Sequence, residues 1–78
     1  MNKIELRIKI LEEIESKSEV DEKILGVSEN DFDDAVNFLK REGYIGGVFY
    51  ADNRPWITKG VTHLTEKGEN YYNSNKTF

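Results

Sequence analysis

The sequence contains no cysteine, and His63 is its only histidine. The first absence excludes disulfide bonds, thiolate catalysis and zinc sites built from cysteine. The second leaves no pair of histidines to hold a metal and no histidine beside a plausible nucleophile. We therefore expect a protein with no metal site, no cofactor and no catalytic activity.

Long apolar runs are also missing. The longest stretch without a charged residue runs from Gly43 to Ala51, far short of the ~20 residues that span a bilayer. Residues 1–15 alternate charged and apolar side chains, so they lack the apolar centre of a signal peptide. The net charge of −4 provides no general attraction to nucleic acid or to anionic membranes. We expect a cytoplasmic protein that contacts no membrane.

The N-terminal segment carries two apolar stripes. A helix is predicted from Asn2 to about Glu15, because apolar residues recur there every three or four positions. One stripe consists of Ile4, Ile8 and Leu11, and the other consists of Leu6, Ile10 and Ile14. Together they cover more of the helix surface than one core contact needs. Either a small domain packs this helix on two sides, or the second stripe contacts a partner helix or a second copy, giving a homodimer through this helix.

Two further helices follow, with clear signals at their ends. The first is predicted from about Val20 to Leu25 and ends at Gly26, the residue type most common just after a helix. Ser28 then caps a helix that continues to Gly43. Four apolar residues of this helix share one face and predict its contact with the core: Phe32, Ala35, Val36 and Leu39.

The last part of the chain predicts a β-hairpin and a final helix. Strands are expected from Tyr44 to Tyr50, with a bulge at the two glycines 46 and 47, and over residues 56–58 and 61–64. Residues 52–55 form the turn. Thr65 caps a helix that ends near Asn73, and residues 74–78 form a flexible tail. Gly68 costs this helix about 1 kcal/mol relative to alanine, which predicts close packing, and we expect the first helix to pack there.

This order of elements is that of a winged helix–turn–helix. The fold class is α+β, with a single domain over residues 1–73 made of three helices, a β-hairpin wing and a C-terminal helix. LKREGYI at residues 39–45 and LTEKG at residues 64–68 look like two landmarks of bacterial winged-helix proteins. DFDDAVNFLKREGYI, followed by LTEKGENY, resembles the YjcQ family of small bacterial and prophage proteins. The resemblance implies a winged helix associated with phages or other mobile elements.

The third helix has the wrong charge for the usual role of a helix–turn–helix. Such a motif reads bases mainly with the N-terminal part of its second helix. Here four of the six residues from Glu29 to Asp34 are carboxylates, which phosphates repel. A DNA-binding transcriptional regulator remains an alternative. Its contacts would be the basic residues Lys40, Arg41, Arg54 and Lys59.

The hypothesis we favour is a non-enzymatic regulatory module that binds another protein. The contact residues would lie on the outer face of the third helix: Asp31, Asp33, Asp34, Asn37 and Phe38. Phe38 is either an interface anchor ringed by carboxylates or a residue that packs beneath the wing or against the first helix. A further alternative is an acidic inhibitor that occupies the basic groove of a nucleic-acid-binding enzyme.

Overall fold

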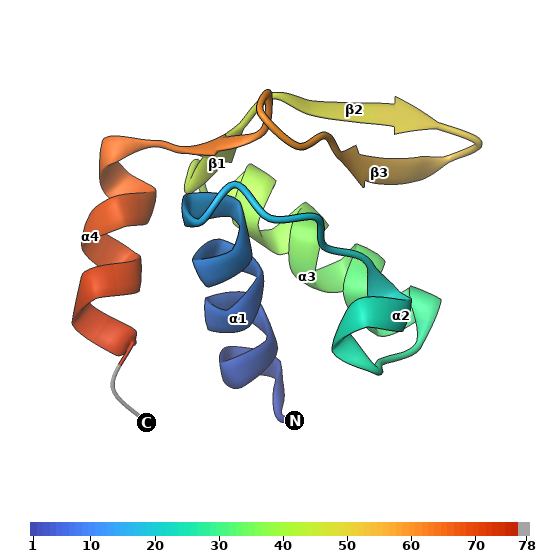
Figure 1. Ribbon diagram of the computed structural model, residues 1–78, viewed down its shortest axis with the longest axis horizontal. Helices are drawn as coiled ribbons and strands as arrows, with labels where there is room; N and C mark the ends of the chain where they lie inside the picture. The colour runs from blue at the N-terminus through green and yellow to red at the C-terminus, as the bar shows by residue number, and fades with distance from the viewer. Residues whose placement is uncertain (77–78) are drawn as a thin grey trace.

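Within residues 1–76, the fold consists of four helices and two short pairs of antiparallel strands (Figure 1). The structure is a computed structural model that describes residues 1–76. The elements are α1 (Lys3–Glu15), α2 (Glu22–Leu25), α3 (Glu29–Arg41), β1 (Ile45–Gly46), β2 (Val48–Ala51), β3 (Arg54–Ile57), β4 (His63–Leu64) and α4 (Glu66–Asn75). The class is α+β, as expected. No helix within residues 1–76 is long and apolar enough to cross a membrane.

Polar side chains cap α3 and α4 at the two residues that the sequence predicted, Ser28 and Thr65. The Ser28 hydroxyl accepts from the amide of Asp31 at 3.1 Å, and Gly26 ends α2 in the left-handed region at a φ of 70°. The predicted start of α2 was wrong: α2 begins at Glu22, because the Asp21 carboxylate caps it by accepting from the amide of Ile24 at 2.8 Å. Val20 lies before the helix and is buried in the core.

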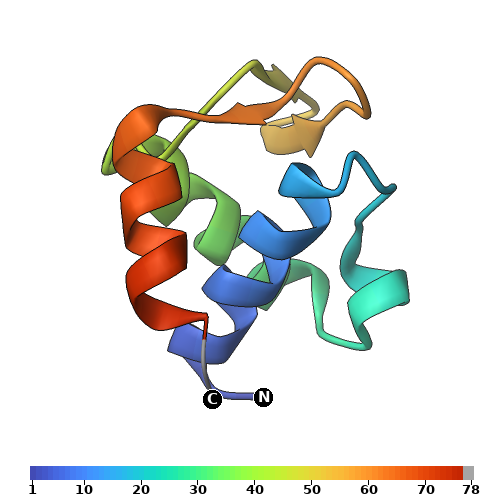
Figure 2. The same ribbon diagram turned by 60° about the vertical axis from the view of Figure 1, so that its left-hand side comes forward.

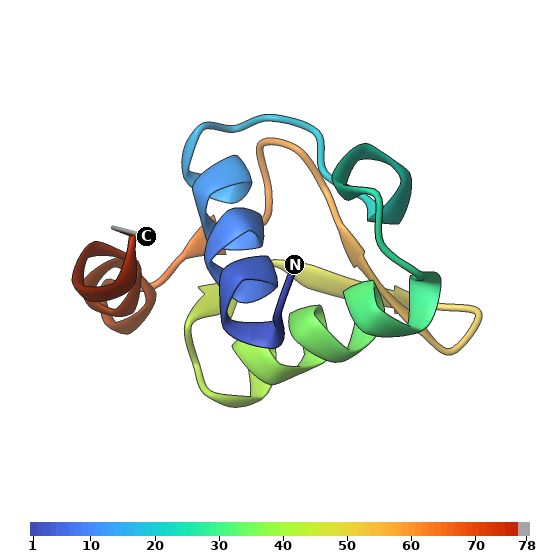
Figure 3. The same ribbon diagram turned by 90° about the horizontal axis from the view of Figure 1, so that it is seen from below.

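Helix α1 lies in the middle of the molecule, with α3 and α4 on different sides of it (Figures 2 and 3). Both of its apolar stripes are therefore buried within one chain, Ile4 being the half-exposed exception. Leu6, Ile10 and Ile14 are at most 5% exposed, so the stripe that suggested a homodimer is not available on the surface. The homodimer itself stays a prediction, but this stripe packs in the core of the chain and does not provide its contact.

The predicted first strand is divided in two at Gly47. This residue has a φ of 73°, and a Cβ there would press against the backbone of Val61. The first piece, β1, pairs with β4, and the second, β2, pairs with β3. The hairpin turn contains two residues rather than four: Asp52 and Asn53 both have positive φ, as a type I′ turn requires.

Hydrogen bonds of two threonine hydroxyl groups stabilise the segment that leads from the hairpin into α4. Thr62 accepts from the amide of Thr58 at 2.9 Å and donates to the carbonyl of Gly47 at 2.8 Å. Thr65 caps α4 by accepting from the amide of Gly68 at 3.1 Å, and it donates to the carbonyl of Gly43 at 2.6 Å. Residues 74 and 75 belong to α4 rather than to a tail, and residues 77–78 lie outside the described residues.

The two bonds of the Thr65 hydroxyl lead to a prediction. Replacing Thr65 with alanine should lower the free energy of unfolding by about 1–2 kcal/mol, because the α4 cap and the bond to Gly43 are both lost. Thr65→Ser is the matched control, since it retains the hydroxyl. Urea denaturation of both variants measures the difference, and an equal loss in the two would show that the hydroxyl is not the cause.

Candidate interaction face

A cluster of charges joins the hairpin to the two helices of the predicted helix–turn–helix. Arg54 on β3 donates from Nε to Asp33 Oδ2 at 2.9 Å and from Nη2 to Asp33 Oδ1 at 3.0 Å. Its guanidinium also lies 3.4 Å from carboxylate oxygens of Glu22 on α2 and Glu29 on α3. The paired geometry with Asp33 is the strong two-point contact that arginine makes with carboxylates. This single cation therefore connects α2, α3 and β3.

The cluster also fixes the protonation of its cation. The pKa of Arg54 is raised above its ordinary value, chiefly by the hydrogen bond to Asp33, and the charges of Asp33, Glu29 and Glu22 add to the effect. A raised pKa means that the stabilising charge is fully present below the ordinary value for arginine, which lies far above neutrality. Arg54 thus remains a cation over the whole physiological range.

This pairing removes one residue from each of the two sets of contact residues that the sequence predicted. Asp33 was expected to contact a protein partner, and Arg54 was expected to contact DNA. In the structure they bind each other, and their side chains are only 16% and 18% exposed. Arg54 is therefore not a free cation for phosphates, and Asp33 is not a free carboxylate for a partner.

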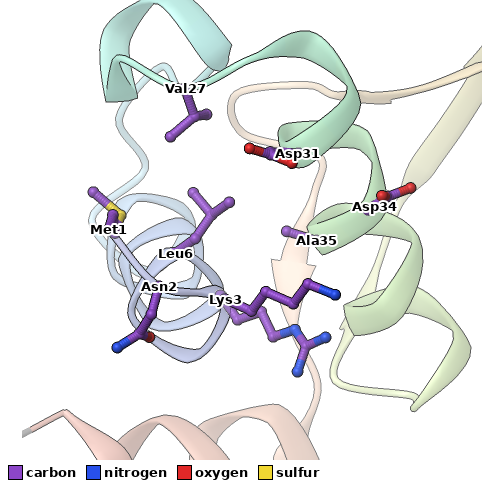
Figure 4. Close-up of a pocket in the computed structure, with 9 residues that line it drawn as sticks. Met1, Asn2, Lys3, Leu6, Val27, Asp31, Asp34 and Ala35 are labelled. Atoms are coloured by element: carbon purple, nitrogen blue, oxygen red, sulfur yellow. The ribbon is translucent and has the colours of Figure 1, made fainter.

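Asp31 and Asp34 remain free on α3, beside the N-terminal end of α1. Both are exposed, and neither forms an ion pair with any of residues 1–76. They line a pocket of about 280 Å³ between α1 and α3, whose lining also includes Lys3 and Arg7. Figure 4 shows Asp31 and Asp34 on α3 and Lys3 on α1. The apolar part of its lining comes from Met1, Leu6, Val27 and Ala35. We call this the α1–α3 pocket. It combines an apolar lining with exposed carboxylates, as an interface anchor site does.

Asn37 and Phe38 have structural roles. The hydroxyl of Tyr50 on the hairpin donates to Asn37 Oδ1 at 2.8 Å, which ties β2 to α3. Phe38 is half-buried, and the guanidinium of Arg7 lies 3.5 Å from its ring centroid. Of the two interpretations of Phe38, packing against α1 is the one observed. The interpretation of Phe38 as an interface anchor stays a prediction.

The other predicted DNA contacts are exposed but belong to different regions. Lys40 and Arg41 lie at the C-terminal end of α3, where Lys40 is 5.2 Å from the ring centroid of Tyr50. Lys59 lies beyond β3 and lines a second pocket, of about 320 Å³, beside Val20 and Trp56. His63 Nδ1 lies 3.0 Å from the carbonyl oxygen of Val61, which accepts the hydrogen bond.

The charges of the chain are divided unevenly. Residues 19–34, which we call the acidic region, hold seven acidic residues and one basic residue, a net charge of −6. The other 62 residues hold ten basic and eight acidic residues, a net charge of +2. Arg54 brings one of those cations to the acidic region and offsets part of its charge. With Arg54 included, the acidic region keeps a net charge of −5.

Fold and site together define a small α+β protein in which a charge cluster joins a two-stranded hairpin to a helix pair. The model of the family described as YjcQ protein matches residues 4–78, and the chain belongs to this family. A relative from Bacillus subtilis (strain 168), described as "Uncharacterized protein YjcQ", is 57% identical over 100% of this chain and 84% of its own length. The solution NMR structure of the Bacillus subtilis YjcQ protein matches with a TM-score of 0.84, covering 94% of this chain and 95% of that one.

Proposed function

We propose that this chain is a winged helix–turn–helix protein of phage or mobile-element type that regulates by binding another protein. Helices α2 and α3 follow one another across the short connection of Gly26, Val27 and Ser28, and the β2–β3 hairpin follows α3 as a wing would (Figure 1). The proposal includes no catalytic step. We expect it to act in the cytoplasm.

The observation that carries this proposal is the α1–α3 pocket with its free carboxylates. Asp31 and Asp34 occupy the part of α3 that a helix–turn–helix would insert into a DNA groove. Phosphates would be repelled by these carboxylates, whereas an apolar side chain flanked by lysine or arginine would find an apolar lining and opposite charge on the α3 side, with Lys3 and Arg7 confined to the α1 side. The partner is therefore a protein with a basic surface around an apolar anchor.

Affinity purification with nuclease treatment tests the proposal, using an Asp31→Lys, Asp34→Lys variant. Wild type should retain a host protein after nucleic acid is digested, and the variant should lose at least about 100-fold in affinity, since two contacts become repulsive. The control is Glu66→Lys with Glu69→Lys, which makes the same charge change on exposed residues of α4. Equal retention by the Asp31/Asp34 variant and wild type would exclude this face.

A DNA-binding regulator is the second candidate, and the exposure of Lys40, Arg41 and Lys59 favours it. Binding to duplex DNA should then weaken with increasing salt and fall in a Lys40→Gln, Arg41→Gln variant. Failure to bind duplex DNA at roughly 20 mM salt, where phosphate contacts are strongest, would eliminate this candidate.

The acidic inhibitor is a narrower form of the protein-binding proposal. Its partner would be an enzyme whose basic groove receives residues 19–34, the segment with a net charge of −6. Such a complex should compete with nucleic acid for that groove, and added oligonucleotide should displace the chain from its captured partner. A partner that binds both together would contradict this form.

A further inference from the structure

Cations from three helices lie close to two neighbouring aromatic rings, those of Phe38 and Tyr44. Arg7 of α1 and Arg41 of α3 lie 3.5 Å and 5.6 Å from the ring centroid of Phe38. Lys67 of α4 lies 5.3 Å from the ring centroid of Tyr44, and the two rings are 6.3 Å apart. We call Arg7, Arg41 and Lys67 on these two rings the cation face. Residues far apart in sequence are thus brought together by the fold.

The cation face lacks compensating charge. Among residues 1–76, neither Arg7 nor Lys67 is in an ion pair, and Arg41 has only a long 3.9 Å contact with Glu42. Asp34 lines the same pocket as Arg7 without pairing with it. The Nε of Arg7 is buried and has no hydrogen-bond acceptor. This Nε lies beneath the surface, so a ligand would contact the exposed charges of Arg41 and Lys67 and not this atom. Three cations without matching carboxylates favour an anionic ligand.

We infer that the cation face binds a carboxylate-rich segment of a protein. Guanidinium groups match carboxylates and phosphates equally well in geometry, so the surroundings decide between them. Phe38 and Tyr44 already carry cations, and Tyr44 stacks on Tyr71 at 4.4 Å, which leaves little free ring surface for stacking nucleic-acid bases. Three cations are also fewer than the roughly 6–10 phosphate contacts typical of duplex binding. An acidic peptide requires neither free ring surface for stacking nor that many cations.

This inference goes beyond the proposed function, because it assigns a second contact surface, of opposite sign to the acidic region and adjoining the α1–α3 pocket at Arg7. A partner could meet the two surfaces separately, so each is tested by its own variants. Reversing the charge of Asp31 and Asp34 tests the first surface, and removing Arg41 and Lys67 tests the second. If one surface fails its test, the proposal for the other surface still stands.

A fluorescein-labelled octaglutamate peptide is the probe, and fluorescence anisotropy at roughly 20 mM salt is the measurement. Wild type should bind it, and Arg41→Gln with Lys67→Gln should weaken binding about tenfold, because two of three attractive charges are removed. Both residues are exposed, so the variant should fold, and circular dichroism verifies this. Lys23→Gln with Lys59→Gln removes the same charge elsewhere and should change affinity less than about twofold.

Several results would overturn the inference. The first is no binding of octaglutamate by wild type, and the second is equal weakening in the control, which would indicate net charge alone. The third is tighter binding of an eight-nucleotide oligothymidylate that is lost in the same variant, which would assign the face to nucleic acid. The fourth is self-association in sedimentation that the variant abolishes, which would make the acidic region of a second copy the occupant.

Discussion

Replacing Gly68 with alanine should lower the free energy of unfolding by about 3 kcal/mol, although alanine is the better helix former. A Cβ at this position would overlap the carbonyl oxygen of Tyr44. That oxygen accepts from the amide of Thr65 at 3.0 Å, so it cannot move aside without loss of the bond that leads into α4. Overpacking and the lost hydrogen bond exceed the gain of about 1 kcal/mol in helix propensity. The expected fall in Tm is more than about 10 °C.

Asn70→Ala is the matched control for this prediction. Asn70 is an exposed residue of the same helix, so alanine there should be neutral or stabilise by a few tenths of a kcal/mol. Thermal unfolding followed by circular dichroism compares the two variants. If Gly68→Ala proves as stable as Asn70→Ala, then α4 does not pack against the backbone of Tyr44 in the way described.

Replacing Arg54 with methionine should lower Tm more than any other single substitution of a charged residue. The substitution keeps most of the apolar stem but leaves the carboxylates of Asp33, Glu22 and Glu29 without their shared cation. Carboxylates held close together without a counter-charge repel one another, and removal of one partner from a partly buried pair costs more than the pair contributes. Lysine at this position should recover only part of the loss, because it lacks the two-point geometry.

Two comparisons show whether the cluster is the cause. Lys59→Met removes an exposed cation from the loop that follows β3 and should leave Tm nearly unchanged. In a double-mutant cycle, Asp33→Asn should be destabilising in wild type but stabilising in the Arg54→Met background, where it relieves repulsion. Additive effects of the two substitutions, or equal Tm values for Arg54→Met and Lys59→Met, would contradict the role given to the cluster.

The local elements could be predicted because their signals are local. The caps at Ser28 and Thr65, the left-handed Gly26 and the buried face of α3 all follow from residues within four positions of one another. The two stripes of α1 could not be interpreted in this way. Their burial depends on where α4 lies, and residues 66–75 contain little apolar periodicity that would reveal this. For the same reason, the sequence predicted that α1 packs against Gly68, whereas the backbone of Tyr44 does so.

The candidate site was predicted less well than the fold. Sequence identified the carboxylates of α3 as unusual, and Asp31 and Asp34 are free as expected. The sequence could not show that Asp33 pairs with Arg54, because 21 residues separate them and several acids compete for each cation. Nor could it show the α1–α3 pocket, whose lining comes from both ends of residues 1–35. Pairing between charges is decided by tertiary geometry, which a count of charges does not contain.

The most direct test of the central claim is an amide correlation NMR spectrum of ¹⁵N-labelled protein, recorded with the captured partner and, separately, with duplex DNA. The claim is that the N-terminal half of α3 contacts protein. The partner should therefore shift the amides of Leu6, Val27 and residues 29–35, and DNA should leave them unchanged. Shifts of residues 29–35 on addition of DNA, with none on addition of the partner, would contradict the account.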